Sequence, residues 1–89
     1  MAYLSKNLSV LAYANGFTLW HYTTPDTAAT VDTAGYFNTA SEMLRVGDMI
    51  LANVETGGAM KGGIFLVNAN AAGVVDVADI TSVGSADTD

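Results

Sequence analysis

Residues 17–24 read FTLWHYTT, and this short stretch decides the kind of fold that the chain can adopt. Aromatic and β-branched side chains dominate it, and an Asn-Gly turn signal directly precedes it. Alternate side chains of an extended chain point to opposite faces, so the stretch predicts a two-faced strand. One face would carry Phe17, Leu19 and His21, and the other would carry Thr18, Trp20 and Tyr22.

The C-terminal half predicts three further strands. They are residues 49–55 (MILANVE), 63–70 (GIFLVNAN) and 74–80 (VVDVADI). A glycine-rich loop at residues 56–62 and a turn at 71–73 separate them. Because such short connections suit antiparallel neighbours, we expect these strands to form hairpins.

Between the two halves the apolar spacing is closer to that of a helix. Residues 30–44 predict a turn of helix at 31–35 and a second helix at 39–44, capped by Asn38 or Thr39. The fold class expected for the single domain of residues 1–89 is therefore mostly β or α+β. It would be a small antiparallel sheet or barrel-like domain of three to five strands with one short helical insertion.

The two ends of the chain carry separate predictions. Residues 1–16 are unusually apolar for a free tail, and they fit either a strand packed in its own domain or an extended arm that crosses to a neighbouring subunit. Residues 82–89 (SVGSADTD) have little to bury and predict a loose acidic tail. No segment looks like a secretion signal or approaches the roughly 20 apolar residues of a membrane span.

The charge balance excludes several classes of partner. Three basic residues face nine acidic ones in 89 residues, which gives a formal net charge of −6. Nucleic acids and anionic lipids require clustered basic side chains, whereas Lys6, Arg45 and Lys61 lie far apart, so neither partner is expected. Without cysteine, and with a single histidine, disulfides and zinc sites are not expected either. A core this small favours stabilisation by self-association or by docking on a larger partner.

The residues capable of chemistry form no recognisable catalytic pattern. His21 lies between two aromatic residues, and no Gly-x-Ser-x-Gly motif accompanies it, so it is interpreted as a packing or interface histidine. Asp48, Glu55, Asp76 and Asp79 lack the spacing of a calcium loop, and the default expectation is that they face solvent. The sequence predicts a non-enzymatic protein with no catalytic residue, cofactor or metal. A small hydrolase that depends on His21 or on an acid pair is the alternative.

Aromatic side chains permit two interpretations. Trp20, Tyr22, Tyr36 and Phe37 are numerous enough to form the main core of so small a domain, or a subunit interface. The alternative is an exposed platform that stacks against sugars.

Four motifs resemble a pattern found in small virion structural proteins of tailed bacteriophages and prophages. They are Ala34-Gly35-Tyr36-Phe37-Asn38, Leu44-x-Val46-Gly47-Asp48-x-Ile50, Gly16-Phe17-x-Leu19-Trp20-His21-Tyr22 and Val74-Val75-Asp76-Val77. The resemblance extends over residues 8–80, and it implies a capsid cement (decoration) protein or a head-fibre protein. It also implies a location on the capsid surface of the virion after synthesis in the bacterial host cytoplasm.

The partners expected from this resemblance are the major capsid protein and further copies of the chain, as a homotrimer or another symmetric homo-oligomer. The residues predicted to make these contacts are Tyr3, Leu4, Leu8, Leu11, Trp20, Tyr22, Met60 and Lys61. Two alternatives stay open. They are a receptor- or carbohydrate-binding module of a head fibre or tail, and a tail or neck component.

Overall fold

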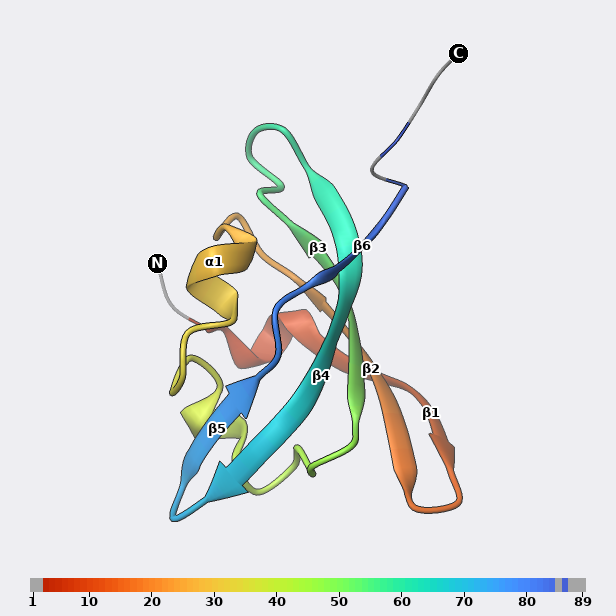
Figure 1. Ribbon diagram of the computed structural model, residues 1–89, viewed down its shortest axis with the longest axis vertical. Coiled ribbons are helices and arrows are strands. Elements are labelled where there is room, and N and C mark those ends of the chain that lie inside the picture. Colours follow the sequence, from red (N-terminus) through yellow and green to blue (C-terminus); the bar gives the residue numbers. More distant parts are fainter. Residues whose placement is uncertain (1–2, 85, 87–89) are drawn as a thin grey trace.

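The computed structural model describes residues 3–84 and 86, and it consists mainly of strands. In chain order the elements are η1 (Ser5–Asn7), β1 (Leu8–Ala14), β2 (Phe17–Thr23), α1 (Ala28–Val31), η2 (Asn38–Ala40), β3 (Met49–Val54), β4 (Lys61–Ala71), β5 (Val74–Val77) and β6 (Thr81–Val83). Figure 1 shows α1 and the segment after it on one side of the strands, while the β1–β2 hairpin projects away from them. The predicted fold class, mostly β with short helical pieces, is confirmed.

The strands form one mixed sheet in the order β1-β2-β3-β4-β5, with β6 also paired to β4. This corrects two details of the prediction, because the sheet has six strands and is not wholly antiparallel. β2 and β3 are parallel, with Leu19 opposite Met49 and Thr23 opposite Asn53. The insertion at residues 24–48 carries the chain back across the sheet between them, and parallel strands require such a crossover.

All four predicted strands exist, with small shifts at their ends. The strand expected at 74–80 stops at Val77, and after a break the chain pairs with β4 again over β6, with Thr81 opposite Ile64 and Val83 opposite Gly62. Ser82 and Val83 therefore belong to the sheet, which corrects the predicted tail at 82–89. Gly84 forms a bend, and most of the remaining tail lies outside the described residues.

The helical insertion is less regular than expected. Its α-helix is α1, slightly earlier than the predicted turn at 31–35, and the Thr27 side chain caps it by accepting a hydrogen bond from Thr30 N. In place of a helix at 39–44 the chain forms η2 and successive turns. Asn38 does not cap a helix, because its Oδ1 accepts a hydrogen bond from Val75 N of β5. So short a helix is unstable alone, and contacts with the sheet decide its form.

The core lies between the insertion and one face of the sheet. Its largest fully buried members include Tyr22, Phe37, Phe65, Leu44 and Ile50. In β2 and β3 buried residues alternate with partly exposed ones, as the sequence predicts for strands packed on one side. The insertion covers this face, and the opposite face of the central strands is left open.

Candidate functional site

The uncovered side of the central strands is the first candidate surface, and we call it the open face. Residues that pair across β2, β3 and β4 point to the same side, so the registers define its members. They are Leu19, His21, Thr23, Met49, Leu51, Asn53, Ile64 and Leu66. None of these side chains is Lys, Arg, Asp or Glu, although the chain carries a formal net charge of −6.

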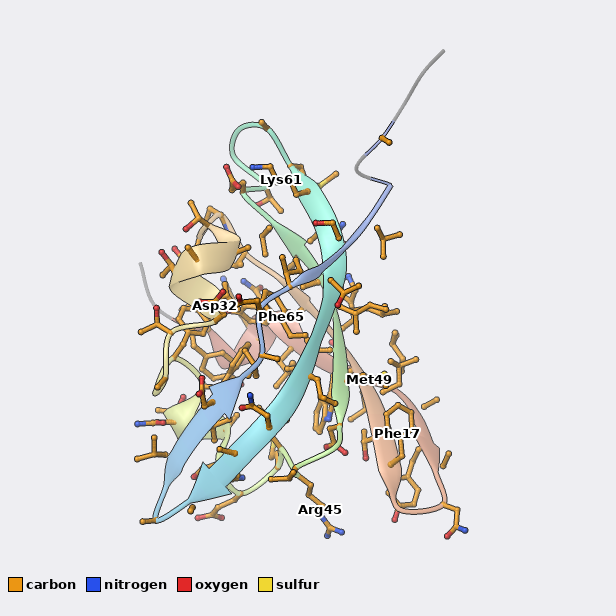
Figure 2. All side chains as sticks on the ribbon, in the orientation of Figure 1. Phe17, Asp32, Arg45, Met49, Lys61 and Phe65 are labelled. Carbon is orange, nitrogen blue, oxygen red and sulfur yellow. The ribbon has the colours of Figure 1, made fainter. Side chains whose placement is uncertain are left out.

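Apolar side chains of the open face remain accessible to solvent. Met49 and Leu66 are each 40% exposed, while Leu19, Leu51 and Ile64 are partly buried. A hollow of about 340 Å³ is lined by Met49, Ile64 and Leu66 of this face and by Ala78, Asp79 and Thr81 beside it. Figure 2 shows the Met49 side chain projecting from the sheet in the direction away from α1. The face has the composition of a contact surface, with an apolar centre and a polar margin.

His21 belongs to this face and has a defined polar partner. Its Nε2 lies 2.9 Å from Oδ1 of Asn53 on the neighbouring strand, and the ring is partly buried. A second hollow, of about 220 Å³, includes His21, Leu51 and Asn53 in its wall. This position agrees with the interpretation of His21 as a packing or interface residue.

The open face was not among the predicted contact residues, although the sequence holds a signal for it. In residues 64–67 (IFLV) and 49–52 (MILA) both alternating sets of side chains are apolar. A strand that is apolar on both faces is typical of sheets covered on both sides. The insertion covers only one side of this sheet, so the second apolar set lacks a cover within the described residues.

The β1–β2 hairpin is the second candidate surface. Val10, Leu11 and Tyr13 are each more than half exposed, and Leu4 just before the hairpin is also exposed. Leu8 is partly buried against the core. Of the predicted contact residues in this region, Leu4 and Leu11 are therefore accessible, whereas Leu8 is mainly a packing residue.

The N-terminal segment packs within its own domain over the described residues. Tyr3 stacks on Tyr22 with ring centroids 5.6 Å apart, and it meets Tyr36 and Phe37 edge-on. Residues 8–14 pair with β2 as β1. Within the described residues this segment therefore forms a packed strand, and Tyr3 contacts the aromatic core of its own chain.

Trp20 and Tyr22 are not contact residues, which corrects that prediction. Trp20 is only 6% exposed and Tyr22 is completely buried, because both point into the core beneath the insertion. Phe37 is also buried and Tyr36 partly so. The core interpretation of these four aromatic residues is confirmed, and no exposed sugar platform exists among them.

A chain of hydrogen bonds runs through the aromatic cluster. The Tyr22 hydroxyl accepts a hydrogen bond from Leu4 N and lies 2.9 Å from the Tyr36 hydroxyl, which donates to Oδ2 of Asp26 over 2.7 Å. Burial raises the pKa of Tyr36, and hydrogen bonds to Tyr22 and Asp26 raise it further, whereas a hydrogen bond to Thr24 lowers it. Tyr36 therefore stays protonated and ties the insertion to the N-terminal segment.

Asp48 is a buried structural carboxylate and not a solvent-facing acid, which corrects the default expectation for this residue. Its oxygens accept hydrogen bonds from Thr18 N, Trp20 Nε1 and Arg45 N, each 3.1 Å long. One carboxylate thus joins β2 to the end of the insertion. Because these partners occupy both oxygens, Asp48 serves the fold and is not available to a ligand.

Asp76 of β5 and Asp79 of the β5–β6 connection lie near Asp32 at the end of α1. Partial burial raises the pKa of Asp32, and the nearby Asp79 and Asp76 carboxylates raise it further. The described residues contain no group of three or more His, Cys, Asp or Glu side chains that could hold a metal ion. The three acids are best described as a region of local repulsion.

This repulsion predicts a pH-dependent effect of Asp32→Asn. The folded state binds the Asp32 proton more tightly than the unfolded state, so the stability contributed by this group falls as pH rises through its folded pKa. At neutral pH the variant should therefore melt a few degrees higher than the wild type. Near pH 3, where Asp32 is largely protonated in both states, the difference should shrink. Thermal melts at both pH values test this, with Glu42→Gln as control, and an equal gain in the control would contradict the local explanation.

The β3–β4 loop holds the last two predicted contact residues. Met60 is 60% exposed, and the exposed Lys61 forms an ion pair with Glu55 over 2.9 Å. The β3–β4 loop and Lys61 lie at the end of the molecule away from the tip of the β1–β2 hairpin (Figures 1 and 2). The predicted contact residues are therefore not brought together into one site.

Comparisons with known proteins add no assignment: no family model, curated protein or solved structure matches this chain. Within residues 3–84 and 86, no helix is long and apolar enough to cross a lipid bilayer. The features available for a functional argument are thus the open face, the β1–β2 hairpin and the sequence motifs.

Proposed function

We propose that this chain is a non-enzymatic structural protein of a tailed-phage virion, a capsid cement protein that binds the outside of the major capsid shell and stabilises it. The observation that carries the proposal is the uncharged, partly exposed apolar open face on an otherwise acidic chain. The resemblance of its motifs to small virion proteins supports the same assignment.

In this function the open face lies against the shell. Covering Met49, Leu66 and their neighbours removes apolar surface from water, which contributes about 25 cal/mol for each Å². The acids of the β5–β6 edge stay at the margin, where they remain solvated. A protein that binds only the assembled shell stabilises it by its binding free energy, and many copies repeat this gain over one particle.

Purified particles that lack the protein provide the test. Adding the full-length wild-type chain should raise the temperature at which the particles release DNA, and Met49→Lys should bind about 10- to 100-fold more weakly, because it would place a charge in a desolvated contact. Met43→Lys is the matched control, since Met43 is 47% exposed but lies on the insertion, opposite the open face.

Three outcomes would contradict the proposal or part of it. Unchanged particle stability after the wild-type chain binds would exclude a cement function. A count of only a few copies in an intact particle would instead favour the alternative of a tail or neck component. Equal weakening by Met43→Lys and Met49→Lys would show that the open face is not the surface that binds the shell.

A further inference from the structure

β1 forms an end of the sheet and has a free edge. It pairs with β2 on one side, and no other strand borders it in the part of the chain that the structure describes. Such an edge presents unpaired backbone N–H and C=O groups, to which another strand can add. Natural proteins usually protect an exposed edge with Lys or Pro, with a bulge or with a covering segment.

Most of these protections are absent from β1. Its sequence, LSVLAYA, contains no charged residue, no proline and no glycine. A register shift at Leu11, between Val10 and Ala12, is the one irregularity in its pairing. Three large apolar side chains of this strand, Val10, Leu11 and Tyr13, are more than half exposed. The strand therefore combines hydrogen-bonding capacity with apolar surface for a partner to cover.

Charge identifies the partner that this edge suits. No Lys, Arg, Asp or Glu occurs between Lys6 and Asp26, a stretch that contains the whole hairpin. Two copies of a chain with a formal net charge of −6 repel each other, and this hairpin lets them meet without bringing acids into contact. It also projects from the body of the molecule, so the acidic parts of the two copies stay apart (Figure 1).

We propose that the edge of β1 pairs with the same strand of a second copy, antiparallel about a twofold axis, so that one sheet continues through two molecules. Such a contact is isologous and closes after two subunits. The other edge of the sheet is a poorer partner for β1. There β5 and β6 are short, the chain leaves the ladder between them, and Asp76 and Asp79 lie along that edge.

This pairing does not rest on the capsid proposal, and the isolated full-length chain tests it. Sedimentation velocity over a concentration series should show the wild-type chain as a monomer–dimer equilibrium. Leu11→Lys should weaken the dimer at least about tenfold, because the added charge would be buried at the new strand pair. Tyr13→Lys, at a second exposed position of the same strand, should weaken it in the same way.

Met60→Lys is the matched control, because Met60 is as exposed as Leu11 but lies in the β3–β4 loop. Each added lysine makes the net charge less negative, and this effect alone favours association. A loss of dimer affinity in the β1 variants, with no loss in Met60→Lys, is therefore specific to the edge. Trp20 fluorescence checks that each variant is folded.

Three results would overturn the pairing: a wild-type monomer at every concentration, a trimer, or β1 variants that associate as the wild type does. A monomeric wild type that still binds particles would refute the pairing alone. A dimer that does not bind them would refute only the capsid proposal.

Discussion

Asp48→Ala is expected to lower the free energy of unfolding by about 3–5 kcal/mol, a large part of the stability of so small a domain. The substitution leaves three donors, Thr18 N, Trp20 Nε1 and Arg45 N, without their acceptor. Each buried donor left unsatisfied costs about 1–3 kcal/mol. The loss is large because this one carboxylate joins two parts of the chain that are distant in sequence.

Urea denaturation followed by fluorescence measures this effect, since Trp20 is the single tryptophan and contacts Asp48 directly. Asp48→Asn retains one oxygen acceptor and should fall between the wild type and Asp48→Ala. Glu42→Ala, at an exposed acid of the insertion, is the control and should be nearly neutral. A loss below about 1 kcal/mol for Asp48→Ala would contradict the structural role assigned to this carboxylate.

Gly63→Ala is expected to destabilise the domain by roughly 1–3 kcal/mol, although alanine is normally no worse than glycine in a strand. A Cβ at position 63 would clash with Cγ1 of Ile80 and would lie 2.7 Å from the backbone oxygen of Thr81. Because the Thr81 oxygen is a backbone atom, a side-chain rotation cannot relieve this second contact, and β6 must move away from β4.

Gly58→Ala provides the comparison, because a Cβ there would meet nothing within 4 Å. It should leave the melting temperature within a degree or two of the wild type. Hydrogen exchange gives a second measurement, since Gly63→Ala should lose protection chiefly over β6. Equal stability of the two variants would show that β6 does not pack as closely on β4 as the structure has it.

Local patterns were enough to predict most of the strands. The alternation in residues 17–24 predicts both β2 and its two faces, and the structure shows that Trp20 and Tyr22 lie on the face toward the core. The β3–β4 and β4–β5 hairpins follow from short connections that contain glycine. These features depend on neighbours in sequence, and a sequence displays them directly.

Features that depend on distant contacts could not be predicted in the same way. The parallel pairing of β2 with β3 arises from the path of the insertion, and the irregular turns after η2 depend on Asn70, whose Nδ2 binds the carbonyls of Ser41 and Leu44. The role of Asp48 likewise requires partners on β2. No local pattern distinguishes this acid from one that faces solvent.

The candidate surfaces were predicted only in part. Leu4, Leu11, Met60 and Lys61 are accessible, as a contact role requires, whereas Trp20 and Tyr22 belong to the core. Large aromatic residues suit both positions, so composition alone does not separate them. The double apolar pattern of β3 and β4 was the better indicator, because only one side of the sheet could be covered by so short an insertion.

The parallel β2–β3 pair has a consequence for synthesis on the ribosome. β2 leaves the exit tunnel before β3. Leu19 can therefore pair with Met49 only after the whole insertion between them has been synthesised. The later strands meet through tight turns, so they can assemble quickly once translated, whereas the N-terminal hairpin depends on a slow, entropically costly closure. Before β2 pairs with β3, the apolar side chains of the hairpin are exposed in the nascent polypeptide, where chaperones can bind them.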